Sequence, residues 1–284
     1  MLKLKNFISW LINFQTPWIV LQPFAKLGTF LTISRNEIER RKIAVEEKKT
    51  FDDIFYPIFI NRKVLHGPFK GISYPELNSI GSTLYSKLIG SYESELHEVI
   101  ERVCTKEYSE ILNIGCGEGY YAIGFSLRIP GSKTFAYDTA PEARRLCFEM
   151  ACLNGVKNRI EIHSTLTSED LKCFRFTKKG FIMCDCEGFE LELFNESNID
   201  NLKNCDLLIE THDFIDISIS TKLATLFSST HDINFIKSKD DIEKAKTYYY
   251  PETEFLSLPL KKALFAEKRP AIMEWIFLSS RANL

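Results

Sequence analysis

Short apolar runs alternate with helical stretches from about residue 109 onward. The runs at 110–114, 133–137, 160–163, 180–184, 206–210, 234–237 and 272–278 predict seven strands. The clearest helix is predicted over 141–154, because Pro141 opens it and Gly155 follows it. This alternation predicts an α/β fold with a seven-stranded, mostly parallel sheet and helices on both faces. The stretch 239–270 is too long for a simple connection, so we expect an insertion near the mouth of a site.

The first 105 residues lack this alternation. They predict a mainly helical extension, which is followed by the α/β domain over 106–284. Residues 7–34 are rich in Phe, Trp, Leu and Ile, but polar residues and prolines interrupt them, which argues against stable membrane insertion. We expect this extension to cover a substrate pocket or to form a contact in a homo-oligomer. A peripheral contact with a membrane is an alternative.

Composition excludes some function classes. The net charge is −2, which argues against nonspecific nucleic-acid binding, because such binding needs a strongly basic surface. The eight cysteines form no Cys-x-x-Cys pair, and several fall in apolar runs. Reduced thiols in a cytoplasmic protein are the simplest interpretation.

A glycine cluster follows the first predicted strand, within the sequence ILNIGCGEGYY at 111–121. Gly115, Gly117 and Gly119 allow a sharp turn beneath a ligand, with the amides of the next helix facing it. Their G-x-G-x-G spacing resembles the first motif of class I S-adenosylmethionine-dependent methyltransferases, which have a Rossmann-like fold. The resemblance implies S-adenosyl-L-methionine as cofactor, with Tyr120 beside it. Asn113 stands where many relatives carry an acidic residue, and we expect it to orient the loop.

The second predicted strand ends at Asp138, 19 positions after Gly119. A carboxylate at this point can accept hydrogen bonds from both ribose hydroxyls of a nucleoside. The alternative is that Asp138 caps the helix that begins near Pro141. Thr165 and Ser168 follow the third strand, where a fold of this kind usually contacts adenine, so we expect both in the cofactor site.

The fourth strand leads into MCDCEGFELELF at 183–194, in which Asp185, Glu187, Gly188 and Glu190 form a D-x-E-G-x-E pattern. This pattern resembles the fourth motif of FkbM-type methyltransferases. That resemblance extends over roughly 109–278 and implies O-methylation of sugars or other hydroxylated natural products. The first loop departs from the family, which commonly has Gly-Ala-Asn where this chain has Gly-Cys-Gly.

Transfer to a hydroxyl requires that the hydroxyl lose its proton, either to a base or with help from a metal ion. We therefore expect Asp185, Glu187 and His212 to be catalytic. The fifth strand ends in LLIETHDF, which places Glu210 and Asp213 next to the fourth strand's end. The resemblance to metal-dependent O-methyltransferases suggests Asp185, Glu210 and Asp213 as ligands of Mg²⁺ or another divalent cation, with His212 as a base or further ligand. A hydrogen-bonded network without metal is the alternative.

The sequence thus predicts a methyltransferase with a small-molecule or carbohydrate acceptor. A non-catalytic binding protein that kept the fold is the alternative. A nicotinamide oxidoreductase is disfavoured by the glycine spacing. Nucleic-acid methylation is disfavoured because neither an Asn-Pro-Pro-aromatic motif nor a basic tract is present.

Overall fold

The computed structural model describes residues 5, 9–10, 13 and 15–282, so part of the predicted N-terminal helical region lies outside the described residues. The chain divides into two compact units, 1–57 and 58–284. This division lies nearer the N-terminus than the domain boundary predicted at 105/106. The physical reason is that residues 58–104 contribute core side chains to the second unit, among them Val64, Phe69, Ile72 and Leu88, all buried.

In the first unit, α2 (Gln15–Phe55) is a continuous helix of 41 residues that has Pro23 in its interior. The helix ends at Phe55. Among the helices formed by described residues, none combines the length and the apolar content that crossing a bilayer would need.

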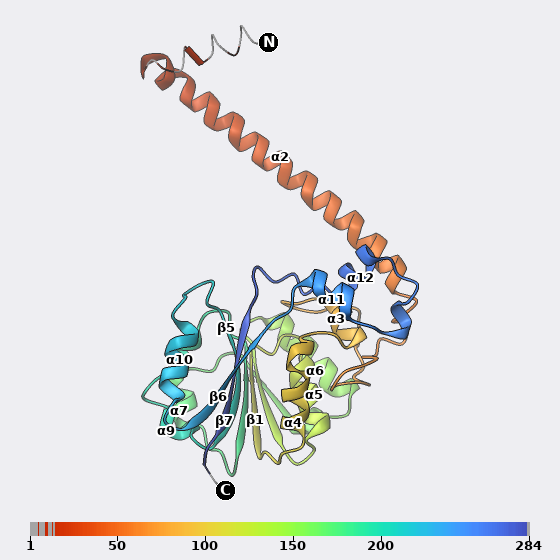
Figure 1. The fold of residues 1–284 in the computed structure, drawn as a ribbon, viewed down its shortest axis with the longest axis vertical. Helices are drawn as coiled ribbons and strands as arrows, with labels where there is room; N and C mark the ends of the chain where they lie inside the picture. Colours follow the sequence, from red (N-terminus) through yellow and green to blue (C-terminus); the bar gives the residue numbers. More distant parts are fainter. Residues whose placement is uncertain (1–4, 6–8, 11–12, 14, 283–284) are drawn as a thin grey trace. The chain divides into compact units, whose positions relative to one another are not determined.

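The second unit contains the predicted seven-stranded sheet (Figure 1). Its strands are β1 (Glu110–Ile114), β2 (Lys133–Tyr137), β3 (Ile160–His163), β4 (Gly180–Cys184), β5 (Cys205–Thr211), β6 (His231–Lys237) and β7 (Glu274–Ser280). Their order is β3-β2-β1-β4-β5-β7-β6, and β7 runs antiparallel to both of its neighbours. β1, β4 and β5 are buried along their whole length, as expected for central strands covered on both faces.

Helices cover both faces of the sheet, as predicted (Figure 1). One face carries α4 (His97–Cys104), α5 (Tyr120–Arg128) and α6 (Pro141–Leu153). The other carries α7 (Ser168–Cys173), α9 (Ile199–Leu202) and α10 (Ile219–Phe227). On this second face, Leu171, Leu202 and Leu223 form one core cluster with the strand residues Ile182 and Leu207.

The remaining elements are short and lie in the connections. They are α3 (Leu84–Ile89), η1 (Ser94–Leu96), η2 (Lys157–Arg159), α8 (Glu190–Leu193), α11 (Asp241–Thr247), η3 (Pro251–Thr253) and α12 (Leu258–Phe265). The last three occupy the predicted insertion between β6 and β7.

The sheet reverses its winding at β1, which pairs with β2 on one side and β4 on the other. A crevice forms at the carboxyl ends of parallel strands where the winding reverses, and ligands of open α/β sheets bind there. The topology therefore places Gly115, Asp138 and Asp185, which follow β1, β2 and β4, at one edge.

Candidate active site

A cavity of about 640 Å³ opens at this edge, between the loops that follow the first four strands. This volume is within the usual range of small-molecule sites. The cavity is lined by Ile114, Gly115, Tyr137, Asp138, Thr139, Ser164, Thr165, Leu166, Thr167, Ser168, Cys186, Glu187, Phe189, Glu192 and Leu193. We call it the larger cavity. Four of the predicted cofactor residues, Gly115, Asp138, Thr165 and Ser168, lie on its wall.

Two backbone amides hold the carboxylate of Asp138. Gly117 N–H donates to Oδ2 over 2.9 Å, and Ala140 N–H donates to Oδ1 over 2.8 Å. The residue at the start of α6 is Ala140, and it makes no side-chain cap. Asp138 therefore does not cap the helix. It is a half-buried carboxylate of fixed orientation on the wall of the larger cavity.

The other side of the larger cavity is formed by the start of α7. Thr167 caps this helix in a reciprocal capping box with Asp170. The hydroxyl oxygen of Ser168 accepts hydrogen bonds from the side-chain amides of Asn195 and Asn198, at 2.7 and 2.9 Å. Ser168 therefore lies on the cavity wall and is hydrogen-bonded to the segment that follows α8.

Asn113, Gly117, Gly119 and Tyr120 do not line the larger cavity. Gly117 acts through its amide on Asp138. Gly119 lets α5 approach α6 closely, because a Cβ there would lie 2.9 Å from the sulfur of Cys147. Tyr120 is buried and packs edge-on against three other aromatic rings. Asn113 is buried in β1, and its Oδ1 has no hydrogen-bond partner among the described residues.

The loop that follows β1 approaches the end of β4 at Gly115. Its φ is +73°, a left-handed conformation that favours glycine, and a Cβ there would overlap the carbonyl oxygen of Asp185. The sequence led us to expect a glycine turn beneath a ligand. The structure adds that the glycine brings the loop after β1 against the residue that follows β4.

A smaller cavity of about 180 Å³ lies beyond the ends of β4 and β5. It is lined by Gly81, Ser82, Tyr92, Asp185, Glu187, Glu210, His212, Phe214, Glu267, Lys268, Arg269, Pro270 and Met273. Glu187 lines both cavities, so the two adjoin at this side chain. Its backbone has φ +55°, a left-handed conformation that is unusual for a residue with a side chain.

His212 is buried and has carboxylates around both ring nitrogens. Its Nδ1 lies 2.7 Å from Oε1 of Glu190. Its Nε2 lies 3.5 Å from Asp185 Oδ1 and 3.5 Å from Glu187 Oε2. The same oxygen of Glu190 also accepts the Gly188 N–H over 3.1 Å. Glu190, which the sequence analysis left without a catalytic role, thus orients the imidazole.

The local electrostatics raise the pKa values of Asp185, Glu210 and His212. Burial, together with the charges of Glu93 and Glu187, raises the pKa of Asp185 to about 7. Burial alone would lower the pKa of His212, but its hydrogen bond to Glu190 and the nearby carboxylates outweigh burial and raise it. Burial raises the pKa of Glu210 well above its usual value, with Asp185 adding to the effect. The acid and base forms of Asp185 are therefore both accessible near neutral pH.

The donors that could share one cation are Asp185, Glu187 and His212, with ligand atoms all within 4.8 Å of one another. The predicted ligands Glu210 and Asp213 are not part of this group, although Glu210 lines the smaller cavity together with Asp185. Glu210 forms an ion pair with Arg269. Asp213 accepts the Ser220 N–H over 2.9 Å and does not line the smaller cavity. The geometry therefore groups a mixed nitrogen and oxygen donor set around the end of β4, which suits a divalent ion.

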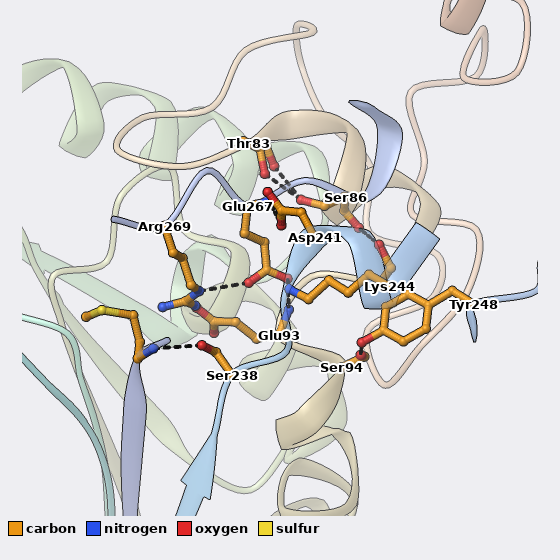
Figure 2. A network of polar contacts seen from close by, with 12 residues as sticks. Thr83, Ser86, Glu93, Ser94, Ser238, Asp241, Lys244, Tyr248, Glu267 and Arg269 are labelled. Carbon is orange, nitrogen blue, oxygen red and sulfur yellow. Dashed lines mark hydrogen bonds and ion pairs between the residues drawn. The ribbon is translucent and has the colours of Figure 1, made fainter. Parts of the chain in front are cut away.

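Arg269 is the main residue of this site that sequence reasoning missed. Its Nε lies 2.9 Å from Glu267 Oε2, and its other nitrogens pair with Glu93 and Glu210. Figure 2 shows Arg269, Glu267 and Glu93 converging, with Lys244 also paired to Glu267. These charges come from distant parts of the sequence, and nothing in their spacing signals that they meet. They tie the insertion to the segment before α4 and to β5.

Glu118, within the glycine loop, was also missed. It is buried and accepts hydrogen bonds from Lys87 Nζ over 2.6 Å, Ser79 Oγ over 3.0 Å and Ile80 N–H over 3.2 Å. The segment that it holds supplies Gly81 and Ser82 to the smaller cavity. An acidic residue between two glycines of the loop could have been suspected of a structural role. A carboxylate buried there needs partners, because burying an unpaired carboxylate is costly.

No protein-family model matches the sequence, and no curated protein matches it. Several solved structures resemble it. A precorrin-6Y C5,15-methyltransferase from Geobacter metallireducens is 13% identical, with 65% of this chain and 88% of that chain covered and a TM-score of 0.41. An S-adenosylmethionine-dependent O-methyltransferase from Thermotoga maritima is 14% identical, with 68% and 67% covered and a TM-score of 0.42. The C-terminal domain of the Rhodobacter capsulatus precorrin-6Y enzyme is 11% identical, with 62% and 82% covered and a TM-score of 0.39.

Proposed function

We propose that this protein is an S-adenosylmethionine-dependent methyltransferase that methylates a hydroxyl group of a sugar or a small natural-product-like acceptor. The observation that carries the proposal is the junction of two unequal cavities at Glu187. One has the size of a nucleoside site and a fixed carboxylate, and the other contains a histidine among carboxylates. A group transfer needs such a pair of sites, because donor and acceptor must be held within reach of each other.

In this proposal the larger cavity holds the cofactor, which when bound supplies an electrophilic methyl group on its sulfonium. Asp138 would accept hydrogen bonds from the ribose hydroxyls, since its orientation is fixed by two backbone amides. Thr165 and Ser168 would lie beside the adenine, on the opposite wall. Gly115 would keep the backbone close beneath the ligand.

The smaller cavity would hold the acceptor hydroxyl. With Nδ1–H donated to Glu190, the lone pair of His212 Nε2 faces Asp185 and Glu187. The hydroxyl proton would pass to Nε2 as the oxygen bonds the methyl carbon and the bond from that carbon to the sulfonium sulfur breaks, which would leave S-adenosylhomocysteine as the product. The resulting imidazolium would be stabilised by the two carboxylates 3.5 Å away.

Within this proposal, a divalent cation is an alternative to the histidine base. Asp185, Glu187 and His212 would hold it, and it would acidify a bound hydroxyl in place of the histidine base. The D-x-E-G-x-E pattern at 185–190 supports an FkbM-type enzyme, since it supplies two of these groups together with Glu190.

Calorimetric titration of S-adenosylhomocysteine tests the cofactor assignment. We expect the wild type to bind and Asp138→Asn to bind about 10–100-fold more weakly, because a charge-assisted hydrogen bond is lost. Asp232→Asn is the matched control, since it makes the same change at a side chain that is 74% exposed on β6. Absence of binding to the wild type would reject the proposal and favour the binding-protein alternative. Equal binding by both variants would reject the role of Asp138.

A further inference from the structure

A group of exposed apolar side chains lies beside the two cavities. They come from the loops that follow β4 and β5, and each is more than half exposed: Phe189, Phe214, Ile215 and Ile217. Phe189 lines the larger cavity and Phe214 lines the smaller one, so these side chains continue the walls of both cavities. We call this group the apolar rim. Large apolar side chains that gather on a surface typically mark a binding site.

The two loops of the apolar rim are packed together at Gly188. Its φ is +101°, and a Cβ there would lie 2.9 Å from Cδ1 of Ile215. The missing side chain therefore lets Ile215 lie against the loop that bears Phe189. On the other side, the ring centroid of Phe214 lies 5.8 Å from that of His212. The apolar rim thus begins beside the proposed base and extends to the loop that follows β4.

Hydrogen bonds fix the backbone of the loop that follows β5. The carbonyl oxygen of His212 accepts the Ile215 N–H over 2.8 Å. The carboxylate of Asp216 accepts the N–H and the hydroxyl of Ser218, at 2.9 and 2.7 Å. The apolar side chains are therefore exposed in a folded loop. Covering them with an apolar ligand would be favourable, because it removes apolar surface from water.

The smaller cavity has room for only part of an acceptor. Its volume is about 180 Å³, whereas sites that enclose a whole drug-sized ligand measure roughly 300–1,000 Å³. Most of the side chains that line it are ionisable, so the part of the acceptor that enters it must be polar. The rest of the acceptor lies outside the cavity, and the surface that adjoins the cavity wall at Phe214 is the apolar rim.

We propose that the acceptor is amphiphilic, with a hydroxylated head that enters the smaller cavity and an apolar body that lies on the apolar rim. This inference rests on the proposed function. Position selects this occupant, because a body attached to a hydroxyl at His212 reaches Phe214 and Ile215 directly. A second copy of the chain bound here would instead cover the walls of both cavities, where the small molecules must enter and leave.

Calorimetric titration of two glucosides into the full-length protein tests the proposal. The probes are methyl β-glucoside and n-octyl β-glucoside, the latter below its micelle-forming concentration, each with and without S-adenosylhomocysteine. We expect the wild type to bind the octyl compound at least about tenfold more tightly, because each buried methylene group adds about fourfold to affinity.

Phe214→Gln with Ile215→Gln should weaken binding of octyl glucoside about tenfold, because apolar surface is removed without a change in charge. S-adenosylhomocysteine affinity should stay unchanged, since neither residue lines the larger cavity. Phe235→Gln with Ile242→Gln is the matched control. It makes the same two changes at exposed positions on β6 and α11 that line neither cavity, and wild-type binding is expected.

The other outcomes overturn the proposal. If the wild type binds neither glucoside, or binds both alike, or if the two double variants bind octyl glucoside alike, the apolar rim does not hold an apolar body. Light scattering identifies the other occupant: a wild-type dimer that the Phe214/Ile215 variant dissociates, without a preference for octyl glucoside, would assign the rim to a second copy.

The same titrations separate this inference from the proposed function. Binding of S-adenosylhomocysteine without a preference for octyl glucoside overturns the amphiphilic acceptor alone. Binding of octyl glucoside that depends on Phe214 and Ile215, without binding of S-adenosylhomocysteine, rejects the methyltransferase and supports the apolar rim as the site of an amphiphilic ligand.

Discussion

Nδ1 of His212 lies 2.7 Å from Oε1 of Glu190, so a buried carboxylate 22 positions earlier fixes the ring of the histidine. Glu190 is fully buried at the start of α8, and His212 immediately follows β5. The contact leaves Nε2 facing Asp185 and Glu187. A histidine oriented in this way serves as a base or as a metal ligand, and in both roles the outer carboxylate makes the imidazole more basic.

We expect Glu190→Gln to weaken divalent-cation binding at the proposed metal site without affecting the proposed cofactor site. Outer carboxylates of this kind contribute about 10–100-fold to metal affinity, so Mn²⁺ binding followed by electron paramagnetic resonance should weaken by that factor. S-adenosylhomocysteine affinity should stay unchanged, since Glu190 does not line the larger cavity. Glu196→Gln, at an exposed position in the same loop region, should bind Mn²⁺ like the wild type. If the wild type binds no Mn²⁺, the metal alternative is wrong and the base mechanism is favoured.

Gly115→Ala should destabilise the protein and abolish S-adenosylhomocysteine binding. The left-handed backbone costs an alanine about 1 kcal/mol, and overlap with the Asp185 carbonyl adds to this cost. Gly155→Ala separates the two effects, because Gly155 has φ +71° with open space around it. Urea denaturation should show a loss of about 1 kcal/mol for Gly155→Ala and clearly more for Gly115→Ala. Equal losses would contradict a close approach between the loop and β4.

The sheet and its crevice were predictable because their signals are local. Apolar runs such as 110–114 and 180–184 specify buried strands, and the order of strand and helix along the chain limits the topology. The ion pairs of Arg269 with Glu210 and Glu93 could not be predicted, because these partners lie 59 and 176 positions away in the sequence. The contact of Asp213 could not be predicted for a related reason: it follows β5, but its carboxylate accepts the Ser220 N–H, a local hydrogen bond that a rule based on strand ends does not reveal.

Arg269→Met should destabilise the protein far more than Arg145→Met. Each arginine pairs with three carboxylates, but Arg269 has a side chain that is 14% exposed and Arg145 one that is 44% exposed. Removing the buried cation leaves Glu93 and Glu210 without their cationic partner, while Glu267 keeps Lys244, and this costs roughly 3–5 kcal/mol. The exposed arginine should cost no more than about 1 kcal/mol. Urea denaturation measures both, and similar losses would contradict the central role of Arg269.

Asp206 should make stability depend on pH in the acid range. Its carboxylate is buried at the start of β5 and accepts hydrogen bonds from Lys106, Tyr108 and Lys179, at 2.7, 2.6 and 2.9 Å, and from Ser280 N–H at 2.9 Å. Burial alone would raise the pKa of Asp206, but these donors outweigh burial and lower it.

The sign follows from proton linkage. Because the folded pKa of Asp206 is lower than the unfolded value of about 3.9, its contribution is fully present above that pH. It is lost as the pH falls from that value through the folded pKa, because over this range the unfolded carboxylate has bound its proton before the native one does. We expect Asp206→Asn to lose roughly 3–5 kcal/mol at pH 7, and its deficit relative to the wild type should shrink below about pH 4. Urea denaturation from neutral to acid pH measures this, with Asp232→Asn as the exposed control. A deficit that does not change with pH would show that Asp206 acts through packing alone.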